Sequence, residues 1–280
     1  MHKTPLVVIK GAGEMASGVA HRLHRAGIAR ICMIEVAAPT SVRRSVSFSE
    51  AVYLGKACVE GVTGELAHDV DSVSEITSRR NVAVLVDPEW RSIDSLAPTI
   101  VVDAILAKRN LGTTITDADL VIGLGPGFCA GRDVHYVIET NRGHDLGRII
   151  RAGFAAPNTG VPGTISGHSA DRVLRAPGKG TFTTNCEIGD IVEAGETIGR
   201  VVAHTAEGTT DRSSPRPVQA GVSGVIRGLI RDGTAVASGQ KIGDVDPRGE
   251  AVYCDTISDK ARTISGAVLE IIVGKVCAPR

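Results

Sequence analysis

The sequence is poor in aromatic residues, in net charge and in long apolar runs. Phe, Trp and Tyr make up 3% of its 280 residues, so aliphatic side chains must fill any core. Lys plus Arg and Asp plus Glu both number 31, which removes the electrostatic basis for binding nucleic acid or an anionic membrane surface. No apolar run approaches the roughly 20 residues that span a bilayer. The composition therefore predicts no nucleic-acid partner and no membrane partner.

Signals for export and for metal binding are also missing. The N-terminal apolar stretch is too short for a signal peptide, so we expect a cytoplasmic protein. None of the six cysteines forms a CxxC pair, and no metal site or disulfide framework is predicted. Cys129 is kept as a speculative catalytic residue, because it lies beside a glycine loop. No other arrangement of residues identifies a reaction.

Apolar runs alternate with helical patterns in the first half of the chain. This alternation predicts an α/β, Rossmann-like doubly wound sheet that forms a nucleotide- or cofactor-binding domain over residues 1–160. A small hairpin is expected over residues 56–69, and a later helix is expected to carry Leu146, Ile149 and Ile150. The expected parallel strands lie at residues 6–9, 31–34, 82–86, 100–102 and 120–122.

An internal repeat organises the second half. Residues 176–201 align with residues 220–245 without a gap at an offset of 44. A unit this small cannot bury an apolar face alone, so we expect the two copies to pack together as a small all-β domain over residues 170–250. Residues 256–274 carry one apolar helical stripe, which predicts a C-terminal helix packed on one domain.

The repeat resembles the barrel-sandwich fold of biotinyl and lipoyl carrier domains. Carrier domains need a modifiable lysine between the two copies, and the connection at residues 204–217 contains none. We therefore expect the fold without biotin or lipoate. The motif GDxVxxGxxIG that carries the resemblance stands here as Gly189, Asp190, Val192, Gly195, Ile198 and Gly199.

The stretch VVIKGAGEMASG matches a dinucleotide-binding turn. Gly11, Gly13 and Ala16 fit G-x-G-x-x-A between a strand and a helix, where backbone N–H groups and the helix dipole favour a phosphate. Glu35 closes the next strand, where an acid usually holds a ribose hydroxyl pair. Glu14 opposes this interpretation, because its carboxylate could cap the helix and repel a phosphate. We expect a nucleotide or molybdopterin-type phosphate ligand, and a turn that binds nothing is the alternative.

Six further candidates for cofactor binding are expected at the same edge of the sheet, because they too follow predicted strands. Three are charged residues after the strand at residues 100–102, and three are glycines in a loop after the strand at residues 120–122. The two basic residues could neutralise a phosphate, and an exposed loop would explain them equally well. The six are Asp103, Lys108, Arg109, Gly123, Gly125 and Gly127.

Five stretches together resemble the YqeB family of accessory proteins in selenium-dependent molybdenum hydroxylase systems. The resemblance implies a maturation factor with a molybdenum hydroxylase apoenzyme as its partner. The stretches, which include GAGEMASGVAHRLHRAG and PNTGVPG, are residues 11–27, 39–52, 123–147, 157–163 and 256–270.

The first half also resembles the Rossmann half of XdhC-type chaperones, which deliver a sulfurated molybdenum cofactor. This second resemblance implies that Gly11, Gly13 and Ala16 hold the phosphate of a pterin or pterin dinucleotide. Two alternatives to a maturation factor stay open: an NAD(P)-dependent oxidoreductase that uses Glu35 for the ribose, and a non-enzymatic interaction module built on the β repeat. A homo-oligomer is also left open.

Overall fold

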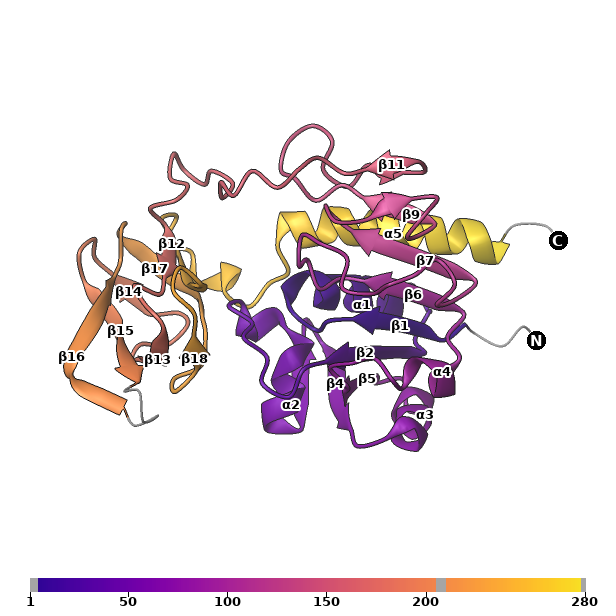
Figure 1. Cartoon of the computed structure of the whole chain (residues 1–280), viewed down its shortest axis with the longest axis horizontal. Helices are drawn as coiled ribbons and strands as arrows, with labels where there is room; N and C mark the ends of the chain where they lie inside the picture. Colours follow the sequence, from indigo (N-terminus) through magenta and orange to yellow (C-terminus); the bar gives the residue numbers. More distant parts are fainter. Residues whose placement is uncertain (1–4, 205–209, 278–280) are drawn as a thin grey trace. The chain divides into compact units, whose positions relative to one another are not determined.

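The computed structural model describes residues 5–204 and 210–277, and these divide into two compact units (Figure 1). Both units combine segments that are distant in the sequence. The connection expected to lack a carrier lysine falls partly on residues 205–209, outside the described residues. Unit 1 holds the described residues of 1–39, 46–159 and 257–280, and unit 2 holds those of 40–45 and 160–256.

A nine-stranded sheet forms the centre of unit 1, in the order β10-β9-β7-β6-β1-β2-β5-β4-β3. The seven strands from β9 to β4 run parallel, and β10 and β3 run antiparallel at the two edges. The strands are β1 (Val7–Lys10), β2 (Ile31–Glu35), β3 (Lys56–Val59), β4 (Val62–Ala67), β5 (Val82–Val86), β6 (Ile100–Asp103), β7 (Leu120–Leu124), β9 (Tyr136–Ile138) and β10 (Ile149–Ile150).

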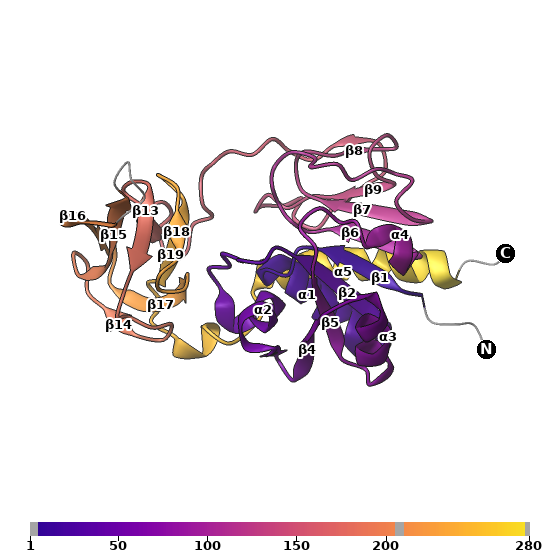
Figure 2. The same ribbon diagram turned by 60° about the horizontal axis from the view of Figure 1, so that its bottom comes forward.

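Two apolar layers cover this sheet. One contains α1 and α5, which lie side by side in both ribbon views (Figures 1 and 2). The other contains side chains of α3 and α4. Among the described residues, no helix is long and apolar enough to cross a membrane. The helices are α1 (Glu14–Arg25), α2 (Ala51–Leu54), α3 (Val70–Ser78), α4 (Ile93–Leu96) and α5 (Asp259–Cys277).

The predicted Rossmann-like doubly wound sheet is wrong. The sheet is mixed, because β3 and β10 pair antiparallel with their neighbours. A doubly wound sheet also needs helical crossovers, but no helix lies between β6 and β7 or between β7 and β9. The helix expected to carry Leu146, Ile149 and Ile150 is wrong too: the two isoleucines form β10, and Gly143 and Gly147 before them have positive φ, which interrupts a helix.

The predicted barrel-sandwich fold is wrong. Unit 2 consists of two four-stranded antiparallel sheets, in the orders β12-β19-β17-β14 and β16-β15-β13-β18. Each sheet joins two strands of one repeat copy to a short strand of the other, since β14 pairs with β17 and β18 pairs with β13. The strands are β12 (Val173–Arg175), β13 (Gly180–Thr183), β14 (Ile191–Val192), β15 (Thr197–His204), β16 (Thr210–Gln219), β17 (Gly224–Leu229), β18 (Ala235–Val236) and β19 (Lys241–Asp246).

Glycines at equivalent positions allow the same strand pairing in both copies of the repeat. A Cβ on Gly180 would lie 2.1 Å from the carbonyl oxygen of Val202, and one on Gly224 would lie 2.2 Å from that of Asp246. Both glycines and both carbonyls are separated by the offset of 44. The same close backbone approach therefore recurs in each sheet, and a side chain at either glycine would force the strands apart.

A glycine also sets the distance between α1 and α5. An added Cβ on Gly18 would lie 2.9 Å from the Cβ of Ala261. Gly18→Ala should destabilise unit 1, because overpacking costs about 1–3 kcal/mol and exceeds the roughly 0.5–1 kcal/mol that alanine gains in a helix. Gly266→Ala on α5 should stabilise the protein, because its Cβ would meet nothing within 4 Å. Urea unfolding measures both free energies, and a stabilising Gly18→Ala would contradict the close contact.

Candidate functional site

The glycine turn joins β1 to α1 at the carboxyl edge of the sheet in unit 1. Gly11 has a φ of +93°, and an added Cβ there would lie 3.4 Å from the Cα of Ile105. Gly13 is the N-cap residue of α1 without a side-chain cap, and Ala16 is buried in the core. The turn therefore lies next to the backbone of the segment that follows β6, and the positive φ of Gly11 favours glycine there.

The Glu35 carboxylate occupies this turn. Its Oε2 accepts a hydrogen bond of 2.8 Å from the Ala12 N–H, and its Oε1 accepts one of 2.8 Å from the Val36 N–H. Burial raises the pKa of Glu35, and the two backbone hydrogen bonds oppose that rise. The sequence placed Glu35 at this edge but predicted a ribose as its partner, whereas the structure gives it a partner within the protein.

A buried ion pair lies at the end of β1. Lys10 is 1% exposed, and its Nζ donates hydrogen bonds of 2.8 Å to Thr113 Oγ1 and to Asp117 Oδ2. The same Nζ lies 4.4 Å from the centroid of the Trp90 ring. Thr113 Oγ1 in turn donates a hydrogen bond of 2.7 Å to Asp103 Oδ2. This network ties β1 and β6 to the loop between β6 and β7.

Asp103, the last residue of β6, is part of this network. Its Oδ1 also accepts a hydrogen bond of 3.2 Å from the Ile105 N–H. Burial raises the pKa of Asp103, while the hydrogen bonds from Thr113 and Ile105 and the charge of Lys10 lower it. Sequence reasoning named Asp103 and missed Lys10. The available signal was a lysine directly after three apolar strand residues, where a charge needs a buried partner.

Gly127 joins the two candidate loops. An added Cβ at this residue would lie 2.6 Å from the Cα of Arg109, so the loop after β7 packs directly on the loop after β6. Arg109 and its neighbour Lys108 are exposed there, and Lys108 has a φ of +64°. Gly123 and Gly125 instead make room for neighbouring side chains. The structure thus brings the two basic candidates to the same edge as the glycine turn.

Lys260 reaches this edge from the first turn of α5, and sequence reasoning missed it by interpreting the helix as structural. Burial lowers its pKa, and the charges of Arg142 and Lys108 lower it further, while Glu14 and Glu139 oppose them. These four residues come from α1 and from the segments after β6 and β9. Within the described parts of the chain, no group lies at hydrogen-bond or ion-pair distance from the Lys260 ammonium.

Cys129 makes local contacts. Its N–H donates a hydrogen bond of 2.8 Å to Asp133 Oδ2, and its Sγ lies 3.8 Å from the carbonyl oxygen of Ala130. A catalytic role for this half-buried cysteine stays a prediction. Across residues 5–204 and 210–277, no three His, Cys, Asp or Glu residues gather as a metal site.

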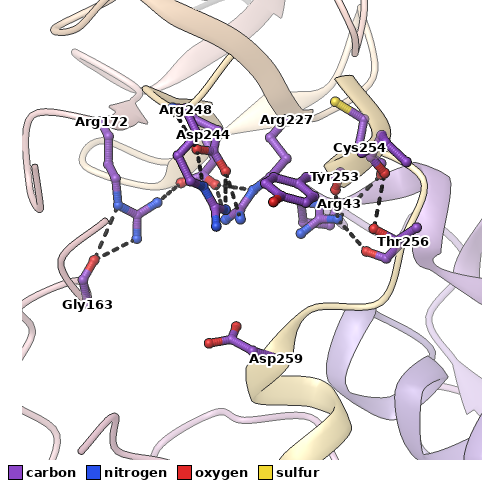
Figure 3. Close-up of polar contacts among 12 residues, drawn as sticks. Arg43, Gly163, Arg172, Arg227, Asp244, Arg248, Tyr253, Cys254, Thr256 and Asp259 are labelled. Carbon is purple, nitrogen blue, oxygen red and sulfur yellow. Dashed lines mark hydrogen bonds and ion pairs between the residues drawn. The ribbon is translucent and has the colours of Figure 1, made fainter. Parts of the chain in front are cut away.

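Unit 2 contains a separate charged cluster around two buried aspartates (Figure 3). Asp244 forms ion pairs with Arg172 and Arg227, and Asp246 forms ion pairs with Arg227 and Arg248. Burial raises the pKa of Asp244, but the charges of a nearby lysine and of two arginines outweigh it and hold the pKa below its usual range. The cluster fastens β17, β19 and the residue before β12, and we assign it a structural role.

Asp244→Ala should therefore destabilise the protein by about 3–5 kcal/mol, because it leaves buried guanidinium groups without their counter-charge. Glu250→Ala removes an exposed carboxylate of the same unit and should change the free energy of unfolding by no more than about 0.5 kcal/mol. Chemical unfolding of the two variants measures the difference. Equal small losses would mean that the cluster contributes no more than a solvated pair.

The Lys10 network makes a similar prediction for unit 1. Lys10→Met should cost about 3–5 kcal/mol, since the buried Asp103 and the half-buried Asp117 lose their cation. Adding Asp117→Asn should recover part of this loss, because it removes one uncompensated charge. Lys56→Met, at a side chain that is 69% exposed, should cost less than about 1 kcal/mol. Urea unfolding tests all three, and a double variant less stable than Lys10→Met alone would contradict the pairing.

No protein-family model matches the chain. Several solved structures match at low identity, including the following three. An aspartoacylase family protein from Mesorhizobium loti has 13% identity and a TM-score of 0.29, covering 87% of this chain and 85% of that one. A succinylglutamate desuccinylase/aspartoacylase from Rhodobacter sphaeroides has 15% identity and a TM-score of 0.28, covering 87% and 86%. The tRNA N6-threonylcarbamoyladenosine dehydratase TcdA of E. coli has 12% identity and a TM-score of 0.29, covering 98% and 88%.

None of these three structures is named as a maturation factor for a selenium-dependent molybdenum hydroxylase, and that prediction is withdrawn. The first two are named as an aspartoacylase family protein and a succinylglutamate desuccinylase/aspartoacylase, and at TM-scores below 0.3 these names assign no activity to this chain. The XdhC-like description and the two alternatives, an NAD(P)-dependent oxidoreductase and a non-enzymatic interaction module, are withdrawn with it. The Rossmann description is corrected by the antiparallel edge strands of the sheet.

A curated relative supports the predicted resemblance to YqeB. The chain is 48% identical over 268 residues to the "Uncharacterized protein YqeB" of Escherichia coli (strain K12), a match that covers 96% of this chain and 47% of that protein. The chain therefore spans about half the length of this curated relative. The similarity confirms the resemblance carried by the five stretches: over nearly its whole length, this chain is a homologue of about half of YqeB.

Proposed function

We propose that unit 1 binds a small anionic molecule at the carboxyl edge of its sheet, with Lys260 and Lys108 as counter-charges. The observation that carries the proposal is the environment of Lys260. This half-buried lysine has a pKa lowered by burial and by the charges of Arg142 and Lys108. A desolvated lysine beside other cations is stabilised in its charged form when an anion is added, and such sites are often functional.

Other charged groups at this edge already have partners. Arg142 donates hydrogen bonds of 2.7 and 2.9 Å to Asp259. The two carboxylate oxygens of Glu139 accept hydrogen bonds from the N–H groups of Asn141, at 2.6 Å, and Ala156, at 2.7 Å. Lys260 therefore has N–H donors available for a ligand.

A phosphate group suits this pair of lysines best. Its oxygens can accept charge-assisted hydrogen bonds from two ammonium groups on separate segments, and lysine serves as a point charge for phosphate in many sites. A carboxylate has fewer oxygens to share between the two. The proposal thus keeps the anionic phosphate expected from the sequence and leaves the rest of the ligand open.

Calorimetric titration with inorganic pyrophosphate tests this proposal, with succinate as the carboxylate arm. We expect pyrophosphate to bind more tightly than succinate and Lys260→Gln to weaken its binding at least about 10-fold, equivalent to about 1.4 kcal/mol. Lys275→Gln is the matched control, because Lys275 is an exposed lysine on the same helix, and it should bind within about 2-fold of the unaltered protein. Unchanged binding by Lys260→Gln, or no binding of either anion to the unaltered protein, would contradict the proposal.

A further inference from the structure

We propose that Glu35 is a specificity-determining residue: its carboxylate fills the glycine turn as an intramolecular anion and excludes an external phosphate from the Ala12 N–H. The inference rests on the proposed function for the place of the ligand's anionic group, which it confines to the Lys260 side of the edge. It gives Glu35 a role opposite to that of a ligand-binding acid.

The hydrogen bonds of Glu35 carry the first step. A carboxylate oxygen at 2.8 Å from the Ala12 N–H stands where an oxygen of a bound phosphate would stand. The second oxygen is held at 2.8 Å by the Val36 N–H, so the carboxylate is fixed at both ends. Because one N–H donates one such hydrogen bond at a time, a phosphate would have to displace Glu35.

Neighbouring segments of unit 1 also restrict movement of the glycine turn. The carbonyl oxygen of Ala12 accepts a hydrogen bond of 2.9 Å from the Ser49 N–H and another of 2.9 Å from Ser17 Oγ. On the other side, an added Cβ at Gly11 would already be 3.4 Å from the Cα of Ile105. Ala12 is therefore held through its carbonyl, in the peptide unit next to the one that carries its N–H, and Gly11 lies against the segment after β6.

Electrostatic repulsion also opposes the binding of a phosphate at the glycine turn. Glu35 is half-buried, where like charges repel one another more strongly than in water. Glu14, in the first turn of α1, places a second carboxylate on the same helix end. A phosphate approaching the turn would thus meet the carboxylates of Glu35 and Glu14, whereas at Lys260 the charges of Glu14 and Glu139 are opposed by those of Lys260, Arg142 and Lys108.

The test uses the Lys260→Gln background, so that the lysine site does not mask the turn. We expect Lys260→Gln/Glu35→Ala to regain phosphate binding by at least about 10-fold over Lys260→Gln alone, because the Ala12 N–H is vacated. Lys260→Gln/Glu35→Gln should regain less, since its amide oxygen can still accept the Ala12 N–H. Lys260→Gln/Glu75→Ala is the control for net charge, because Glu75 lies on α3 and pairs with Arg79, and it should regain nothing.

Two measurements separate this inference from the proposed function. Amide NMR of ¹⁵N-labelled protein should show the Ala12 signal moving on addition of inorganic phosphate in the Glu35→Ala variants and staying fixed in the unaltered protein. If the Ala12 signal moves in the unaltered protein, or if neither Glu35→Ala nor Glu35→Gln gains binding in folded protein, the inference is overturned. Failure of the proposed function alone would appear as equal pyrophosphate binding before and after Lys260→Gln.

Discussion

Neutralising the buried Lys10 ammonium is the constraint on which the candidate site depends. A cation at the end of a central strand is costly unless it is paired and hydrogen-bonded. Asp117 and Thr113 supply the partners, and both lie on the loop between β6 and β7. That loop has no helix to fix it, so the ion pair draws it onto the sheet. The exposed Lys108 and Arg109 are held in place as a consequence, against the backbone at Gly127.

The missing crossover helices have a second consequence for unit 1. One face of the sheet needs an apolar cover beyond α1, and the last helix of the chain provides it through residues such as Ile264 and Val268. The close approach at Gly18 sets where α5 lies. Lys260, in the first turn of that helix, is thereby brought to the edge where β1, β6 and β9 end. The packing of α5 on the sheet therefore also places Lys260 in the candidate site.

In unit 2 the backbone packing is repeated in both copies, but the cluster of ion pairs is not. Its two copies share the close glycine–carbonyl approaches that allow their strands to pair. The buried aspartates have no counterpart at the first copy: at the offset of 44, Asp244 corresponds to Arg200, and Asp246, directly after the second copy, corresponds to Val202. Backbone geometry is thus preserved between the copies, while the ion pairs that fasten β17 and β19 are particular to one of them.

Local patterns in the sequence determined the positions of most parallel strands, the glycine turn and the repeat, because periodicity and glycine spacing act over a few residues. They also predicted the hairpin of β3 and β4. They did not determine the antiparallel strand β10, the cover provided by α5 or the charge network of Lys10, which depend on contacts between distant segments. Glu35 shows the difference between what local patterns determined and what tertiary contacts determined. The sequence placed its carboxylate at the correct edge, but only the tertiary structure decided that it faces the Ala12 N–H, because the distance between the end of β2 and the turn is set by the packing of the whole sheet.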